Sequence, residues 1–228
     1  MQRQPEPELM DDPEQAQAYA QADFDAPHSQ FMALFHERFG DAVAGLASAL
    51  VLDLGCGPGD ITCRFARHYP NAVIDALDGA PAMLQLAAVR VQQQGVSGRI
   101  NLWQRHLPDV HGLAPCYDVI ISNSLLHHLH DPMVLWHCIQ SHLRPGTQLF
   151  VMDLLRPASV AAARRLVAEN AGDEPTALQH DFYNSLLAAY RLDEVQAQVL
   201  QAGLGWLRVE QVSDRHFAVS GRAPILLG

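Results

Sequence analysis

The sequence predicts a doubly wound α/β fold, in which a mostly parallel sheet of seven strands lies between two layers of helices. From residue 50 onward, short apolar runs alternate with segments of helical character. The first five runs are apolar along almost their whole length, which is typical of parallel strands covered on both faces. Right-handed crossovers between such strands place helices on both sides of the sheet. The 228 residues, 49% of them hydrophobic, are enough for one sizeable core.

Residues 1–47 are predicted to form a flexible arm and a helical lid. Pro5, Pro7 and Pro13 among acids indicate a loose segment over about residues 1–12. Residues 14–47 carry apolar side chains at helical spacing, and Pro27 is expected to divide them into two helices.

The main domain is predicted to span residues 48–222, with residues 223–228 as a tail. Its parallel strands are expected at residues 50–54, 72–77, 100–104, 117–122 and 147–154. The helices between them are expected at residues 60–69, 80–94 and 132–143. A helix at residues 193–202 and an antiparallel pair of strands at residues 207–213 and 216–221 are expected to close the domain.

The regular alternation stops after the fifth strand. Residues 158–171 and 176–189 indicate two helices with no strand between them, so residues 156–190 are predicted to be an insertion. Because ligands bind at the carboxyl edge of open α/β sheets, we expect the insertion to cover that edge.

Composition narrows the class of partner. Twenty-five acids against fifteen bases give a net charge of −10, which disfavours nucleic acid or an anionic membrane as a partner and leaves only a local basic patch open for such binding. All fifteen bases are arginine, so Schiff-base chemistry and a phosphate-loop lysine are excluded. No apolar run approaches the roughly 18 residues of a membrane helix, and the acidic start is unlike a signal peptide. We therefore expect a cytoplasmic protein without membrane insertion.

The four cysteines, Cys56, Cys63, Cys116 and Cys138, form no C-x-x-C pair. They predict neither a zinc site nor a disulfide framework. On this basis we expect no metal.

Three alternate glycines follow the first predicted strand. The strand carries Asp53 near its end and continues into Gly55, Gly57 and Gly59 before a helix begins. Glycine permits a tight turn and lets backbone amides approach a ligand. Asp60 occupies the position where a dinucleotide fingerprint has a small residue, and its carboxylate would repel a pyrophosphate. Asp60 thus weakens the dinucleotide interpretation, and a ligand loop is favoured over a generic glycine-rich turn.

A second acid, Asp78, ends the second predicted strand nineteen residues after Gly59. A carboxylate at this place can accept hydrogen bonds from both hydroxyls of a ribose. Asp75 is a rival, but it falls inside the apolar run. The alternative role for Asp78 is to cap the helix that begins near Pro81.

Residues 51–59 (VLDLGCGPG) resemble the first motif of class I S-adenosylmethionine-dependent methyltransferases, and residues 78–84 (DGAPAML) resemble their second. The resemblance extends over about residues 48–155. It implies a Rossmann-like fold, S-adenosylmethionine as cofactor and S-adenosylhomocysteine as product. The cofactor-binding residues that it implies are Asp53, Gly55, Cys56, Gly57, Gly59, Asp78, Gly79, Met83, His106, Leu107 and Asn123.

The third strand departs from the family pattern. The family often has an acid after this strand to bind the adenine amino group, whereas this chain has Arg105 or His106. A backbone carbonyl or the Gln104 amide is left for that contact, with Leu107 packing on the ring.

Residues 122–132 (SNSLLHHLHDP) resemble the strand-four segment of small-molecule methyltransferases of the quinone-biosynthesis and natural-product types. The resemblance implies that Asn123 meets the amino end of the cofactor and that His127 and His128 face its methyl group. Asp153, at the end of strand five, would lie beside them, and a carboxylate there fixes the tautomer of an imidazole that accepts a proton. Two alternatives remain: a metal site that uses His127 and His130, and histidines with a purely structural role.

The acceptor is expected to bind between the lid and the insertion. Tyr19 and Tyr183 are the candidate contacts, while Phe182 is interpreted as a core residue of its helix. The predicted function is transfer of a methyl group to an O, N or C atom of a small molecule. The alternatives are a nicotinamide-dependent oxidoreductase and a non-catalytic protein that binds the cofactor or its demethylated product.

Overall fold

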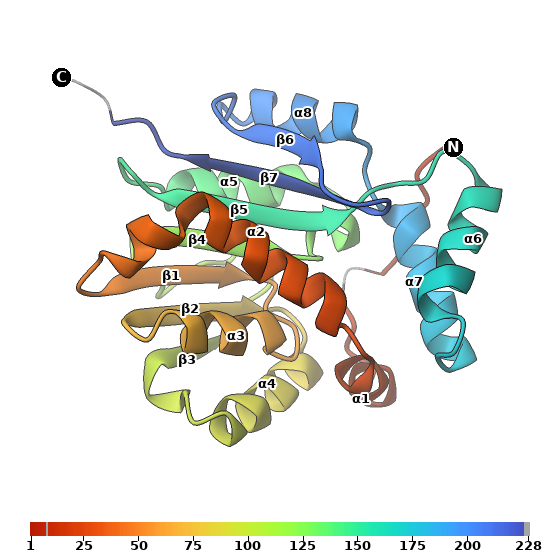
Figure 1. The fold of residues 1–228 in the computed structure, drawn as a ribbon, viewed down its shortest axis with the longest axis horizontal. Helices are drawn as coiled ribbons and strands as arrows, with labels where there is room; N and C mark the ends of the chain where they lie inside the picture. Colours follow the sequence, from red (N-terminus) through yellow and green to blue (C-terminus); the bar gives the residue numbers. More distant parts are fainter. Residues whose placement is uncertain (8, 226–228) are drawn as a thin grey trace.

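The computed structural model describes residues 1–7 and 9–225, which form one seven-stranded sheet covered by helices on both faces (Figure 1). The strand order is β3-β2-β1-β4-β5-β7-β6. The parallel strands are β1 (Ala49–Leu54), β2 (Ala72–Asp78), β3 (Ile100–Gln104), β4 (Val119–Asn123) and β5 (Gln148–Leu154). The antiparallel edge consists of β6 (Arg208–Gln211) and β7 (His216–Arg222). The predicted doubly wound fold is confirmed.

The two faces of the sheet carry separate helical layers. One layer consists of α2 (Asp25–Ala44), α3 (Asp60–His68) and α4 (Pro81–Gln93), and the other of α5 (Met133–Ser141) and α8 (Leu192–Gln201). Because successive side chains of a strand point to opposite faces, Val51 belongs to the first core and Leu52 to the second. Burial on both faces is the reason that most positions of β1, β2, β4 and β5 are apolar. Within the described residues, no helix combines the length and apolar character needed to span a membrane.

The sheet has its topological switch point at β1, which pairs with β2 on one side and β4 on the other. The loop after β1 leads toward β2 and the loop after β4 leads toward β5, so the two loops diverge and leave a crevice between them. In open α/β sheets this crevice is where ligands bind. A short helical turn, η2 (Leu126–His128), follows β4 at this edge, and another, η1 (Ser97–Arg99), precedes β3.

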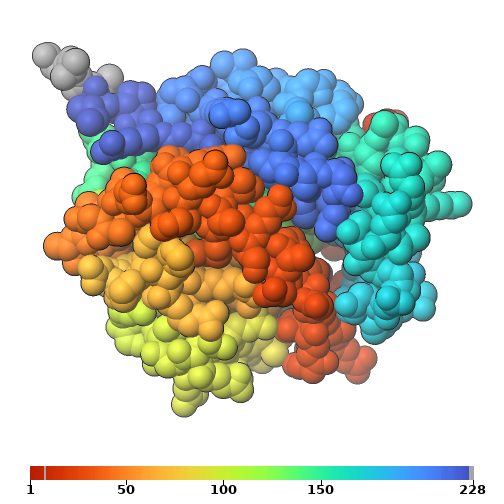
Figure 2. Space-filling view, viewed as in Figure 1, coloured from red at the N-terminus to blue at the C-terminus, as the bar shows by residue number. Residues whose placement is uncertain are grey.

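The insertion forms a pair of helices, α6 (Val160–Ala171) and α7 (Thr176–Ala188), at the carboxyl end of the sheet. Its inner surface contacts η2. Gln15 of α1 (Pro13–Gln21) donates a hydrogen bond to Asp181 of α7 at 3.2 Å. Figure 2 shows the N-terminal segment and the insertion at the same end of the molecule. The predicted position of residues 156–190 over this edge agrees with the structure.

The division of the N-terminal helices differs from the prediction. The break lies at residues 22–24, whereas Pro27 falls in the first turn of α2. The first turn of a helix has no partner for its backbone N–H groups, so proline is tolerated there. Pro27 therefore marks the start of a helix and not its interruption.

The N-terminal arm is not a loose segment in its described part. The backbone N–H of Gln4 donates to the Leu187 carbonyl at 3.0 Å, and Arg3 Nε donates to the Ala188 carbonyl at 2.6 Å. The Arg3 guanidinium also lies over the Tyr190 ring, 4.1 Å from its centroid. The polar composition predicts a solvated arm, but the Arg3 side chain and the Gln4 backbone have specific partners at Ala188 and Leu187, more than 180 residues away in the sequence.

Candidate active site

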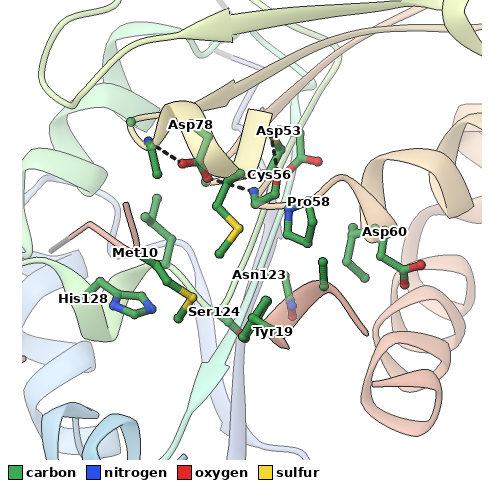
Figure 3. A pocket seen from close by; sticks show the side chains of 18 of the residues that line it. Met10, Tyr19, Asp53, Cys56, Pro58, Asp60, Asp78, Asn123, Ser124 and His128 are labelled. Carbon is green, nitrogen blue, oxygen red and sulfur yellow. Dashed lines mark hydrogen bonds between the residues drawn. The ribbon is translucent and has the colours of Figure 1, made fainter. Parts of the chain in front are cut away.

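A pocket opens at the carboxyl ends of β1, β2 and β4 (Figure 3). Its walls come from the loops that follow β1 to β4, and its cover comes from the arm and α1 through Leu9, Met10 and Tyr19. In Figure 3, Met10 and His128 lie on one side of the pocket and Asp60 on the other. All the residues predicted to bind the cofactor line this pocket except Gly59. Gly59 instead lies against α4, where an added Cβ would be 3.2 Å from that of Ala87.

Two glycines of the loop after β1 serve different needs. Gly55 has φ +72°, and a Cβ there would lie 2.8 Å from the Leu125 side chain. Gly57 has φ +51°, and a Cβ there would meet nothing within 4 Å. Both conformations favour glycine. The first glycine allows the loop to lie against the segment after β4, and the second leaves open space on the side where a ligand approaches.

Asp78 connects the loops after β1 and β2. Its Oδ2 accepts a hydrogen bond from the Gly57 N–H at 2.8 Å, and its Oδ1 accepts one from the Ala80 N–H at 2.8 Å (Figure 3). Burial raises the pKa of Asp78, and the backbone donors oppose that shift. A carboxylate has about four acceptor positions, so Asp78 can cap α4 and still accept from a ribose hydroxyl. The two roles considered for this residue are compatible.

Asp75, the rival acid, has other partners. Its carboxylate accepts hydrogen bonds from Asn101 Nδ2 at 2.9 Å, Trp103 Nε1 at 3.0 Å and the Tyr117 hydroxyl at 2.8 Å. It is buried and does not line the pocket. Asp75 therefore organises the interior beside β3 and is not available to a ligand.

Asp53 lies at the bottom of the pocket with 1% of its surface exposed. Burial raises its pKa to about 7, with a hydrogen bond from the Thr62 hydroxyl at 2.6 Å acting in the opposite direction and the charge of Asp78 adding to the rise. The carboxyl group thus changes charge near neutral pH. A cationic ligand group placed beside it would favour the ionised form.

Asp60 is held by bases from three helices. His28 Nδ1 of α2 and Arg64 Nε of α3 each lie 2.6 Å from Asp60 Oδ2, and Arg90 of α4 lies 3.4 Å from Oδ1. Burial alone would raise the pKa of Asp60, but His28 and Arg64 outweigh it and hold the pKa well below its usual range. Asp60 therefore joins α2 to α3 and α4 at the wall of the pocket.

His127 and Asp153 form a buried pair at the ends of β4 and β5. His127 Nδ1 lies 2.6 Å from Asp153 Oδ1, while Asp153 Oδ2 accepts from the Leu126 N–H at 2.7 Å. Burial alone would lower the pKa of His127, but the carboxylate of Asp153 raises it. The parallel register of β4 and β5 brings the two residues together, as the sequence predicts.

His128 lies at the boundary between this pocket and a second one. Its burial and the neighbouring His127 lower its pKa to about 3, so the ring is neutral at neutral pH. The residues shared by the two pockets are Met10, Tyr19, Ala22, Asp23, Phe24, His28, Asn123, Ser124 and His128. The two pockets are therefore neighbours that meet at the histidine segment.

The second pocket lies between the lid and the insertion. His127 forms part of its wall on the sheet side, and α6 and α7 form the opposite wall. Tyr19 lines it, but Tyr183 does not, and Phe182 takes the place expected for Tyr183. Consecutive residues of a helix point about 100° apart, so only one of the two can face the pocket. Both Phe182 and Tyr183 also pack against the apolar cluster beneath the insertion, as the sequence predicts for Phe182.

The sequence gives no sign of several residues at the site. Glu6 lies 3.5 Å from His127 Nε2 and 3.3 Å from His128 Nδ1 through its Oε1. Met10 lines both pockets, as does His28. These residues carry no motif, because only the folding of the arm and lid over the sheet brings them to the histidines.

Part of the sequence is similar to known methyltransferases. Residues 51–146 match a family described as a methyltransferase domain. Trans-aconitate 2-methyltransferase of Mycobacterium tuberculosis strain H37Ra is 38% identical over 104 residues, which cover 44% of this chain and 35% of that protein. The enzyme of the same name from Deinococcus radiodurans is 33% identical over 154 residues, covering 67% and 52%. This chain thus spans about a third to a half of the length of these relatives.

The fold has a counterpart among solved structures. A SAM-dependent methyltransferase from Aquifex aeolicus superimposes with a TM-score of 0.59 over 88% of this chain and 99% of the other, at 18% identity. Residues 51–146 are thus similar to a methyltransferase domain, and the fold of the chain is that of a protein described as a SAM-dependent methyltransferase.

Proposed function

We propose that this chain is an enzyme that transfers the methyl group of S-adenosylmethionine to a hydroxyl or amino group of a small molecule. The observation that carries the proposal is that two pockets meet at Asn123, Ser124 and His128. The first pocket has the glycine loop and Asp78, and the second lies between the lid and the insertion. A methyl group at the boundary would face an acceptor in the second pocket.

The reaction class suits this arrangement. The methyl group of a sulfonium is already activated, so an in-line displacement mainly requires alignment of the two reactants and exclusion of water. The arm and α1 supply the cover. We assign positioning of the acceptor and uptake of its proton to the polar group at the boundary, formed by His127, His128 and Asp153.

The charge of the second pocket limits the charge of the acceptor that it can bind. Its lining contains Asp23, Glu169, Glu174 and Asp181 but a single arginine, Arg215. Trans-aconitate, named for the relatives, carries three carboxylates, which these acids would repel. We therefore propose an acceptor that is neutral or carries an amine, and we expect no turnover of trans-aconitate.

Thermal unfolding with ligands tests the cofactor. S-adenosylmethionine or S-adenosylhomocysteine at 100 times its dissociation constant should stabilise the protein by about 2.7 kcal/mol, a shift of several degrees. The variant Asp78→Ala should lose this shift, because Asp78 also orders the glycine loop. A shift with NAD alone would overturn the proposal and favour an oxidoreductase.

Turnover distinguishes an enzyme from a binding protein. The chain is incubated with S-adenosylmethionine and panels of polyhydroxylated, amine-bearing and carboxylic acceptors, and S-adenosylhomocysteine is measured. Release of product with the first or second panel supports the proposal. Tight cofactor binding without release on any panel would favour the non-catalytic alternative.

A further inference from the structure

Three side chains able to bind a metal converge at the wall of the second pocket. Glu6 comes from the arm, and His127 and His128 come from η2. One nitrogen of each ring and one carboxylate oxygen all lie within 4.8 Å of one another. Glu6 Oε1 is 3.5 Å from His127 Nε2 and 3.3 Å from His128 Nδ1. Two imidazoles and one carboxylate are a donor set that divalent transition metals prefer.

The contacts within this group are not those of a satisfied hydrogen-bond network. His128 Nδ1 is buried and makes no hydrogen bond in the described part of the chain, although Glu6 Oε1 is only 3.3 Å away. His127 Nδ1 is engaged by Asp153, which directs the other nitrogen, Nε2, toward Glu6. Neighbouring polar atoms that lie close but are poorly aligned for a hydrogen bond are the arrangement expected of two ligands of a common ion.

The separations match those of a metal site. Zinc lies about 2.0–2.2 Å from nitrogen and oxygen ligands, so adjacent tetrahedral ligands are about 3.4 Å apart. The two measured separations, 3.3 and 3.5 Å, lie on either side of this value.

Outer partners hold two of the three side chains in place. Asp153 lies 2.6 Å from His127 Nδ1, and ligating histidines commonly donate their second N–H to a carboxylate. The Ser185 hydroxyl lies 3.1 and 3.3 Å from the two oxygens of Glu6. The negative charges of Glu6 and Asp153 attract a cation to the site. The positive charge of Arg3 weakens this attraction in part. Its guanidinium donates hydrogen bonds to the carbonyls of His127 and Leu129.

We propose that Glu6, His127 and His128 bind a divalent transition metal ion, for which zinc has the best-matched chemistry. The ion would join the arm to η2 at the wall of the acceptor pocket, which both histidines and Ser185 line. There it would face the acceptor, and with the ion bound His127, whose two ring nitrogens would both be engaged, would hold the ion and would not take up the acceptor's proton. Its role toward the acceptor rests on the proposed function, but the binding of the metal does not. His130 is not part of this site, because its Nε2 lies 3.0 Å from the backbone carbonyl of Glu6.

The test is zinc binding by the tag-free full chain after dialysis against a chelator. Titration calorimetry should give one tight site, and Co²⁺ in its place should give the visible absorption of a tetrahedral complex. The variants Glu6→Gln and His128→Ala should each weaken binding by at least about tenfold, since loss of an outer partner alone costs that much. His137→Ala is the matched control, because His137 is exposed on α5, and it should bind as the wild type does.

The possible results separate clearly. The metal site is overturned if zinc binding is not saturable. It is also overturned if Glu6→Gln and His128→Ala leave zinc binding unchanged. In that case the ion belongs to other histidines, such as the neighbouring pair His36 and His68. The thermal shift with S-adenosylmethionine is measured on the same samples. A cofactor shift without zinc binding rejects the metal site alone, whereas zinc binding without a cofactor shift rejects the proposed function alone.

Discussion

At the scale of single residues, the chemistry of the pocket is set by where the fold places a few carboxylates. Asp53 is buried at the end of β1, and Asp78 receives backbone N–H groups from two loops. Asp75 lies in the same strand as Asp78 but has three side-chain donors of its own. Three similar side chains thus have three different roles, which their surroundings determine.

The burial of Asp53 predicts that cofactor affinity depends on pH. The pKa of Asp53 is raised to about 7, mainly by burial, whereas the amino group of S-adenosylmethionine is cationic and favours the carboxylate. Below pH 7 Asp53 is protonated in the free protein and must lose its proton when the cationic cofactor binds. We therefore expect cofactor affinity to fall by up to about tenfold per pH unit as pH decreases. Calorimetric titrations at pH 6, 7 and 8 measure this, and Asp53→Asn should flatten the profile. Parallel profiles for the two proteins would contradict the prediction.

The open space beside Gly57 predicts a binding defect without a folding defect. In Gly57→Ala the positive φ costs about 1 to 2 kcal/mol of stability, and the new methyl group points into space that no protein atom occupies. We expect cofactor affinity to fall at least tenfold. Gly95→Ala is the matched control, since Gly95 has φ +67° and nothing within 4 Å but lies outside the pocket. Equal loss of affinity in both variants would refute the role of the loop.

At the scale of elements, the helices around the pocket are joined by ionic contacts. Asp60 links α2, α3 and α4 through His28, Arg64 and Arg90. In a dinucleotide fold, an acid at this place would repel a phosphate. Here the charge of Asp60 is balanced by His28, Arg64 and Arg90. The side chain that follows the glycine loop therefore holds helices together.

The Asp60 cluster predicts a pH-dependent contribution to stability. The folded-state pKa of Asp60 is lowered, so its contribution is fully present above the unfolded-state pKa of about 4 and is lost as pH falls below that value. Asp60→Asn should reduce the free energy of unfolding by about 1 to 2 kcal/mol at pH 7, and the difference from wild type should shrink between pH 5 and pH 2. Urea unfolding across this range measures it. Asp41→Asn, an exposed change on α2, should show no such difference.

At the scale of the whole molecule, the candidate active site is assembled from segments far apart in the chain. The first pocket contains residues from the arm, α1 and the loops after four strands, and the second adds the insertion. Figures 1 and 2 show these parts together at one end of the sheet. The cover of the site therefore depends on tertiary contacts of the arm and α1 with the insertion.

This assembly predicts the pattern of protection by the cofactor. On addition of S-adenosylhomocysteine, hydrogen exchange should slow in the glycine loop and in the segment around Asp78. It should also slow in residues 9–22, because Leu9, Met10 and Tyr19 line the same pocket. The helices α5 and α8, on the far layer, serve as the internal control. Protection confined to the two loops would show that the arm and α1 do not close over the cofactor.

The sequence by itself determined the alternation of strands and helices, the order of the elements and the glycine loop with its two acids. These features are local: burial on both faces leaves continuous apolar runs, and a tight turn at positive φ requires glycine in a fixed spacing. Only the tertiary structure decided that Phe182 lines the second pocket in place of Tyr183 and that Glu6 reaches His127 and His128. Each of these depends on how elements pack against one another across long stretches of chain, and such contacts leave no periodicity in the sequence.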